Sequence, residues 1–168
     1  GPEAGAAYIF FFFFGGADNW GQAVRLVPSD LQEYDRFGQG VAVDGNTAVV
    51  GAWWNDGNGA QSGAAYVFQR DFSSPGQWTQ VAKLIANDVT NHFGFSVGVS
   101  GDNVIIGAPW DDDLGNQAGA AYIFGRDVGG PNSWGQLGKI TATDSHSAGF
   151  GESVAISGNS AVVGVIYD

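Results

Sequence analysis

The segment GAAYIF at residues 5–10 decides the fold, because it returns as GAAYVF at 63–68 and again as GAAYIF at 119–124. The copies begin 58 and 56 residues apart. A tryptophan follows the last phenylalanine of each copy by ten residues, at Trp20, Trp78 and Trp134. Since two markers keep the same spacing three times, we interpret the chain as a repeat protein.

Each unit contains a second pair of segments with the alternation typical of strands. A Phe-Gly pair, at 37–38, 93–94 and 150–151, precedes apolar runs at 40–52, 96–108 and 153–165. Every run is interrupted by a short glycine turn, which indicates a hairpin: Asp44-Gly45-Asn46, Ser100-Gly101-Asp102 and Ser157-Gly158-Asn159. With the GAAYIF-type strand and the tryptophan strand, each unit has four antiparallel strands. We therefore predict an all-β fold, a β-propeller of four-stranded blades.

The order of these motifs resembles the FG-GAP repeat of integrin-type propellers, and most closely its bacterial variety. The Phe-Gly pair, VIIGAP at 104–109 and GAAYIF at 119–124 carry the resemblance, which covers essentially the whole chain. The full Gly-Ala-Pro stands only at 107–109. The resemblance implies a non-enzymatic binding or adhesion scaffold, extracellular or at the cell surface, that recognises protein or glycan through its loops.

The strands amount to about three blades, with half a blade at each end. We expect one repeat domain over 1–168, divided into a half-blade at 5–28, blades at 29–86 and 87–142, and a half-blade at 143–168. Propellers usually have four to eight blades, and open sheet edges are usually covered. Two explanations stay open: two copies close a six-bladed ring, or the chain is part of a longer propeller. The first makes the protein a self-assembling structural module, which is the alternative function.

The composition narrows the range of partners. The net charge is −11, from six Lys and Arg against seventeen Asp and Glu, so a nucleic-acid partner is not expected. The chain has no cysteine, which excludes disulfides and thiolate chemistry. No apolar stretch is long enough to span a bilayer, so we expect no membrane insertion.

Calcium is the cation that the resemblance suggests, but the family's usual calcium position holds only tight turns here. A two-residue turn cannot supply the six to eight oxygen ligands that calcium takes. The acidic loops after the second strand of each blade are separate candidates for a cation. They contain Asp111, Asp112 and Asp113 in one unit and Asp56 and Asn58 in another. The alternative is a solvated polar loop.

Three tryptophans in the same loops, Trp53, Trp54 and Trp110, are candidates for a ligand platform, with packing at the blade edge as the alternative. Asp30, Asp88 and Asp144 recur between blades, and we assign them an architectural role. His92 and His146 lie close to Asp88 and Asp144, but no further catalytic partner is evident. We therefore predict no enzymatic activity and no cofactor other than a calcium ion.

Five consecutive phenylalanines occupy positions 10–14. Alignment of the repeats makes Phe10 an ordinary blade residue and gives Phe14 apolar counterparts. Phe11, Phe12 and Phe13 stand where the other copies have Gln or Gly followed by Arg-Asp, which we interpret as a turn leaving the sheet. An exposed aromatic patch there favours a subunit interface. An engineered or misassigned stretch is the alternative.

Overall fold

In a computed structural model, the structure describes residues 3–12, 14–74, 76–88, 91–143 and 149–166. These residues form strands and connecting loops. The strands are β1 (Ala7–Phe12), β2 (Trp20–Leu26), β3 (Phe37–Asp44), β4 (Thr47–Ala52), β5 (Ala64–Arg70), β6 (Trp78–Leu84), β7 (Ser96–Ser100), β8 (Asn103–Ala108), β9 (Ala120–Arg126), β10 (Trp134–Ile140), β11 (Ser153–Ser157) and β12 (Ser160–Gly164). Within the described part of the chain there is no helix that could cross a membrane.

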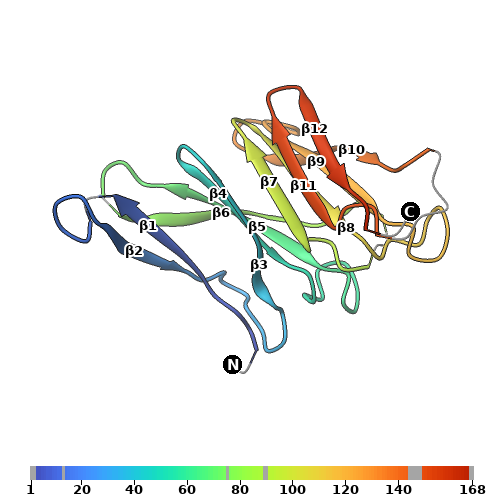
Figure 1. The fold of residues 1–168 in the computed structure, drawn as a ribbon, viewed down its shortest axis with the longest axis horizontal. Helices are drawn as coiled ribbons and strands as arrows, with labels where there is room; N and C mark the ends of the chain where they lie inside the picture. The colour runs from blue at the N-terminus through green and yellow to red at the C-terminus, as the bar shows by residue number, and fades with distance from the viewer. Residues whose placement is uncertain (1–2, 13, 75, 89–90, 144–148, 167–168) are drawn as a thin grey trace.

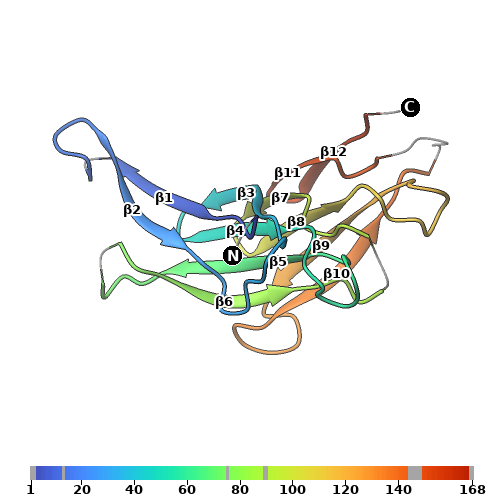
Figure 2. The ribbon, with the colours of Figure 1, turned by 90° about the horizontal axis from the view of Figure 1, so that it is seen from below.

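The strands form two complete blades and two strand pairs (Figures 1 and 2). One four-stranded sheet has the order β3-β4-β5-β6 and the other β7-β8-β9-β10, while β1-β2 and β11-β12 are two-stranded. All pairings within the sheets are antiparallel. The predicted all-β class and the four-stranded blades are confirmed.

The glycine turns close the inner hairpin of each unit. Asp44 pairs with Thr47, Ser100 with Asn103 and Ser157 with Ser160, so each turn contains two residues. Gly45, Gly101 and Gly158 have φ of 54°, 56° and 54°. Residues with a side chain rarely adopt this left-handed backbone conformation, whereas glycine adopts it readily. Tight hairpin turns require this conformation.

The blades stack face to face, and two apolar clusters fill the spaces between them. In the two complete blades, the phenylalanine of the Phe-Gly pair packs edge-on against the aromatic residues of the GAAYIF-type strand in the same blade. Phe93 lies 5.4 Å from Tyr122 and 5.8 Å from Phe124 between ring centroids. Phe37 makes the corresponding contacts with Tyr66 and Phe68. The repeated motifs are therefore the core residues of one blade.

Close backbone contact between blades explains the glycines of these motifs. A Cβ at Gly51 would lie 1.8 Å from the carbonyl oxygen of Gly94, and one at Gly107 would lie 2.0 Å from that of Gly151. In both cases the glycine at the end of an inner hairpin touches the Phe-Gly pair of the next blade. This contact sets how closely neighbouring blades approach at their inner strands.

The phenylalanine run differs from the turn predicted for it. Phe11 and Phe12 are the last residues of β1, and Phe12 pairs with Trp20 as Arg70 pairs with Trp78. The strand therefore continues through the arginine position. The guanidinium of Arg70 covers the ring of Phe11 at 4.4 Å. Phe13 lies outside the described residues.

Candidate ligand-binding face

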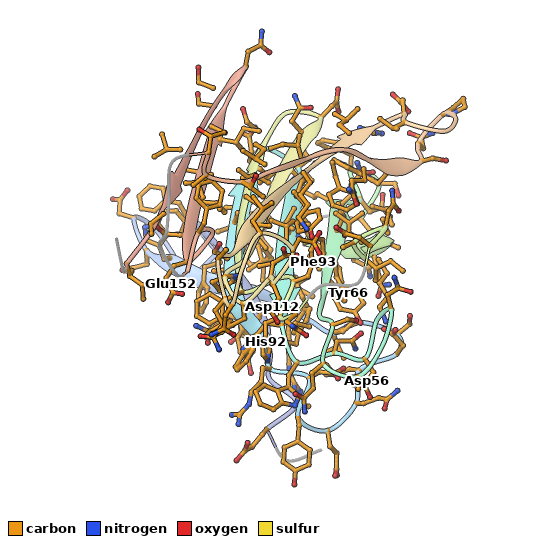
Figure 3. The ribbon with its side chains drawn as sticks, turned by 90° about the vertical axis from the view of Figure 1, so that its right-hand side faces the viewer. Asp56, Tyr66, His92, Phe93, Asp112 and Glu152 are labelled. Carbon is orange, nitrogen blue, oxygen red and sulfur yellow. The ribbon has the colours of Figure 1, made fainter. Side chains whose placement is uncertain are left out.

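Two loops with the same conformation emerge from one end of the blades. They connect β4 to β5 (residues 53–63) and β8 to β9 (residues 109–119). In each loop an aspartate accepts a hydrogen bond from the backbone amide five residues later: Asp56 from Gln61 at 2.9 Å and Asp112 from Gln117 at 2.7 Å. Figure 3 shows Asp56, Asp112 and His92 at this end of the molecule.

Five ring side chains form one cluster between these two loops. The indoles of Trp53 and Trp110 are nearly parallel, at 23° and 5.9 Å. His92 contacts both indoles, with its ring centroid 4.9 Å from each. Trp54 is 4.8 Å from Trp53, and Phe95 is 5.0 Å from Trp110. All five side chains are half-buried, so the cluster forms part of the surface.

The cluster contains polar ring atoms without partners. Among the described residues, neither ring nitrogen of His92 nor the Nε1 of Trp53 has a hydrogen-bond partner. Burial lowers the pKa of His92 below its ordinary value. The imidazole is therefore neutral at pH 7, and its two ring nitrogens, one donor and one acceptor, are buried without a hydrogen-bond partner among the described residues.

The structure brings together Trp53, Trp54 and Trp110, which were predicted as a ligand platform. Their role in binding stays a prediction. His92 and Phe95 were missed as members of the cluster, although both flank the Phe93-Gly94 pair. The signal was a difference between repeats, because Phe95 stands where the other units have Gln39 and Glu152.

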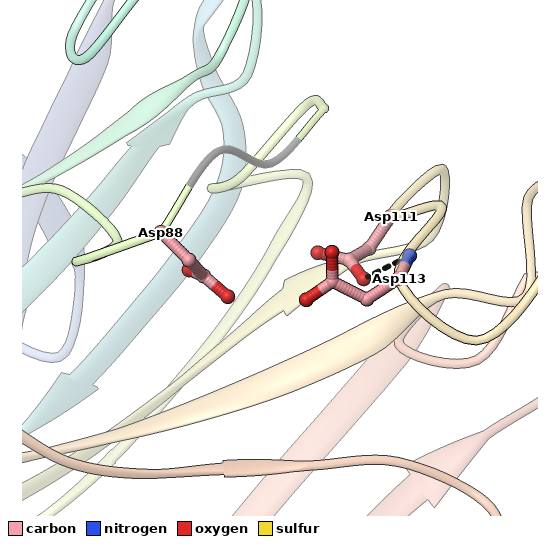
Figure 4. Close-up of side chains that lie close together, drawn as sticks. All are labelled: Asp88, Asp111 and Asp113. Carbon is pink, nitrogen blue, oxygen red and sulfur yellow. Dashed lines mark hydrogen bonds between the residues drawn. The ribbon is translucent and has the colours of Figure 1, made fainter.

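The acidic loop contributes to a second cluster. The carboxylates of Asp88, Asp111 and Asp113 each offer an oxygen within 4.8 Å of the others (Figure 4). The Nζ of Lys139 lies between them, 2.9 Å from both Asp88 Oδ2 and Asp111 Oδ2, and it also pairs with Asp113. The Tyr122 hydroxyl donates to Asp111 at 2.8 Å. The lysine ammonium therefore occupies the position where a cation would be coordinated.

The network stabilises the charged form of this lysine. Burial by itself lowers the pKa of Lys139, but its hydrogen bonds with Asp113, Tyr122, Asp111 and Asp88 outweigh burial and raise the pKa above the ordinary range. A metal ion would have to displace a permanently charged side chain. The arrangement is suited to holding β10 and two loops together.

The remaining cation candidates have other hydrogen-bond partners and, in the described part of the chain, form no hydrogen bond or ion pair with Lys139. Asp112 accepts from Gln117 and from the Asn91 side chain at 3.2 Å. Asp56 accepts the Gln61 amide, and the amide group of Asn58 donates to the Ala86 carbonyl at 3.4 Å. A cation site at Asp111, Asp112, Asp113, Asp56 and Asn58 stays a prediction. The two-residue turns between β3 and β4 and between β7 and β8 do not fit calcium.

The neighbouring blade repeats the network in a simpler form. Lys83 pairs with Asp30 at 2.6 Å, as Lys139 pairs with Asp88. Its Nζ lies 5.5 Å from the Tyr66 ring, as that of Lys139 lies 5.2 Å from Tyr122. Burial raises the pKa of Asp30, but the hydrogen bonding and charge attraction of Lys83, together with Tyr66 and the local backbone, outweigh burial, and the net shift is downward. Asp144 and His146 lie outside the described residues.

Comparison with known proteins identifies the family. The family model for the FG-GAP repeat matches residues 20–68, 78–124 and 134–168. No curated protein matches the chain. The matched segments include all three Phe-Gly pairs and two of the three GAAYIF-type strands. The chain belongs to the FG-GAP repeat family.

Proposed function

We propose that the protein is a non-enzymatic binding or adhesion scaffold, located outside the cell or on its surface. It recognises a protein or glycan ligand through the β4–β5 and β8–β9 loops. The FG-GAP repeat is a scaffold and adhesion-type domain of the integrin-like propeller class, typical of extracellular and surface proteins. The finer assignment to these loops rests on the side chains that they present.

The half-buried cluster of Trp53, Trp54, His92, Phe95 and Trp110 carries this proposal. Ring faces pack against the apolar faces of sugars and against aliphatic or aromatic side chains. Exposed carboxylate and amide groups in the same loops provide hydrogen-bond partners that orient a ligand: Asp56, Asn58, Asp112, Asn116 and Gln117. A few polar groups beside an apolar surface are typical of ligand-binding sites.

The test is a binding screen with matched variants. The wild-type protein is applied to an array of immobilised oligosaccharides and to an array of extracellular protein domains. Trp54→Ala and Trp110→Ala remove rings from the cluster. Phe72→Ala is the control, because Phe72 is an exposed aromatic residue in the β5–β6 connection, at the opposite end of β5.

We expect at least one ligand whose affinity falls about tenfold or more in a tryptophan variant and is unchanged in Phe72→Ala. Binding that persists in both tryptophan variants would place the site elsewhere. The absence of ligands on both arrays would contradict a recognition function for these loops.

A further inference from the structure

Residues that form the core of the complete blades are exposed in the two strand pairs. Val162 of β12 is 71% exposed, whereas Val49 of β4 and Ile105 of β8, at the same position of the repeat, are fully buried. Because the side chains are alike, the difference comes from what packs on them. The β11-β12 pair therefore presents a blade interior to solvent.

The β1-β2 pair shows the same mismatch. Tyr8 is 48% and Phe10 is 51% exposed, while the corresponding Tyr66, Tyr122, Phe68 and Phe124 are buried. In the complete blades these positions pack against the phenylalanine of the Phe-Gly pair. Phe150 is the phenylalanine of the third Phe-Gly pair and precedes β11. By analogy, the exposed Tyr8 and Phe10 are the residues against which a Phe150 side chain would pack.

Each strand pair borders an apolar groove. One groove, of about 450 Å³, lies between β1 and the β3-β4 hairpin, and its lining includes Phe10, Val41 and Val43. The other, of about 290 Å³, lies between β9-β10 and β11-β12, and its lining includes Ile123, Ile140 and Ile156. Val41 is exposed, whereas Val97, which occupies its position in the next blade, is buried against β4 and its neighbours.

We propose that a second copy of this chain covers these surfaces by strand complementation. The β11-β12 pair of one copy joins the β1-β2 pair of the other, which gives a four-stranded blade of order β11-β12-β1-β2. In this blade β12 pairs antiparallel with β1, as β4 pairs with β5 and β8 with β9. The backbone edges of β1 and β12 then gain the hydrogen bonds that strand addition supplies.

The complete blades also predict the register in which β12 of one copy pairs with β1 of the other. We call this contact between the copies the joint. Val49 pairs with Val67 in one complete blade and Ile105 with Ile123 in the other. The same register places Val162 opposite Ile9 of the second copy and Ser160 opposite Phe11. Phe150 then packs on Tyr8 and Phe10 of the second copy. Phe11 and Phe12, predicted as interface residues, thereby lie at the end of the joint where β1 ends and β12 begins.

Two identical joints close the assembly. Each copy has two complete blades and gives one half of each shared blade, so two copies form a six-bladed ring with twofold symmetry. The joining strands β1, β11 and β12 contain no charged residue, although the chain carries a net charge of −11. Repulsion between the copies therefore does not act across the joint itself.

Cysteine cross-linking tests the register, because the chain has no cysteine of its own. Ile9→Cys and Val162→Cys are made in separate chains, mixed and oxidised. We expect a disulfide-linked heterodimer on a non-reducing gel. The control mixes Ile9→Cys with Leu114→Cys, a residue of similar exposure in the β8–β9 loop. Equal cross-linking in both mixtures would overturn the proposed register.

Sedimentation velocity tests the assembly without cross-linking. We expect wild-type protein to sediment at about twice the monomer mass of 17.4 kDa. Val162 is exposed in a single chain, so Val162→Glu should leave the packing of that chain unchanged. We expect this variant to sediment as a monomer with the circular dichroism spectrum of the wild type. Leu114→Glu should remain dimeric. Wild-type protein that stays monomeric up to about 100 µM would overturn the proposal. Strands of an adjoining repeat in a longer polypeptide would then be what covers the exposed surfaces of the two strand pairs.

This assembly does not depend on the ligand-binding function. The joint uses β1, β11 and β12, whereas the proposed ligand site uses the loops at 53–63 and 109–119. Loss of one in a variant therefore leaves the other measurable.

Discussion

Lys139 is the residue on which the polar network of the β7-β8-β9-β10 blade depends. Its ammonium is shared by Asp88, Asp111 and Asp113, and Asp111 is only 1% exposed. Replacing Lys139 with methionine leaves a buried carboxylate facing two others without a cation. We expect Lys139→Met to lower the free energy of unfolding by about 3 kcal/mol, measured by urea denaturation.

Lys83→Met is the matched control for Lys139→Met. Lys83 has one carboxylate partner, Asp30, and both side chains are substantially exposed. Its removal should cost about 1 kcal/mol or less, because exposed ion pairs contribute little. Equal losses in the two variants would show that the network around Lys139 is not the stabilising feature.

His92 makes stability depend on pH. Its pKa in the folded state lies below the ordinary 6.5 because the ring is buried among tryptophans. As the pH falls through 6.5, His92 takes up a proton in the unfolded chain before it does so in the folded chain. Protonation therefore favours the unfolded chain, and the free energy of unfolding falls below this pH. We therefore expect the free energy of unfolding to decrease from about pH 7.5 to pH 5.

The His92→Asn variant isolates this contribution. Asparagine tolerates the left-handed backbone of residue 92, whose φ is 61°, and it does not titrate in this range. The decrease in stability between these pH values should be smaller in the variant than in the wild type. Parallel pH curves for the two proteins would contradict the assignment to His92.

At the scale of the elements, the contact between Gly51 and Gly94 controls how blades stack. A methyl group at Gly51 has no space, since the Gly94 oxygen would be 1.8 Å away. We expect Gly51→Ala to lower the free energy of unfolding by about 3 kcal/mol through separation of the inner strands. Thermal or urea unfolding measures the change.

Gly138 in β10 supplies the control for Gly51→Ala. A Cβ there meets no atom within 4 Å, and its φ is not in the left-handed region. Gly138→Ala should therefore change stability by about 0.5 kcal/mol or less in either direction. A comparable loss at both glycines would mean that the cost belongs to strand glycines in general.

At the scale of the whole molecule, net charge opposes the proposed ring. Two chains of −11 repel each other through solvent, while the joining strands carry no charge. Salt screens this repulsion, with a Debye length of about 10 Å at 0.1 M. The dimer dissociation constant should therefore fall as sodium chloride rises from about 0.02 to 0.3 M, measured by sedimentation equilibrium. A constant that rises with salt would mean that ion pairs hold the copies together.

The sequence predicted the strands and their order because each marker acts locally. The glycine turns at 45, 101 and 158 require left-handed backbone, and alternating apolar residues distinguish strand faces. The repeat then assigned equivalent roles to equivalent positions. Phe12 shows the limit of this reasoning: a strand end is set by pairing with Trp20, which composition alone does not reveal.

The candidate site was predicted in part. The three tryptophans were identified because indoles beside acids in a loop are conspicuous in any sequence. His92 and Phe95 were not assigned to the cluster, since their positions in it follow from how one blade stacks on the next. The cation candidates Asp111 and Asp113 do converge, but with Asp88, which lies 23 residues earlier in the chain than Asp111.

The sequence by itself therefore determined the β-class, the blade unit and the family, because these depend on turns, alternation and spacing within one repeat. Only the tertiary structure decided that Lys139 occupies the centre of the acidic cluster and that five rings meet between two loops. It also showed that Tyr8, Phe10 and Val162 are exposed. These properties depend on which surfaces of neighbouring blades touch, and the spacing of residues along the chain does not contain that information.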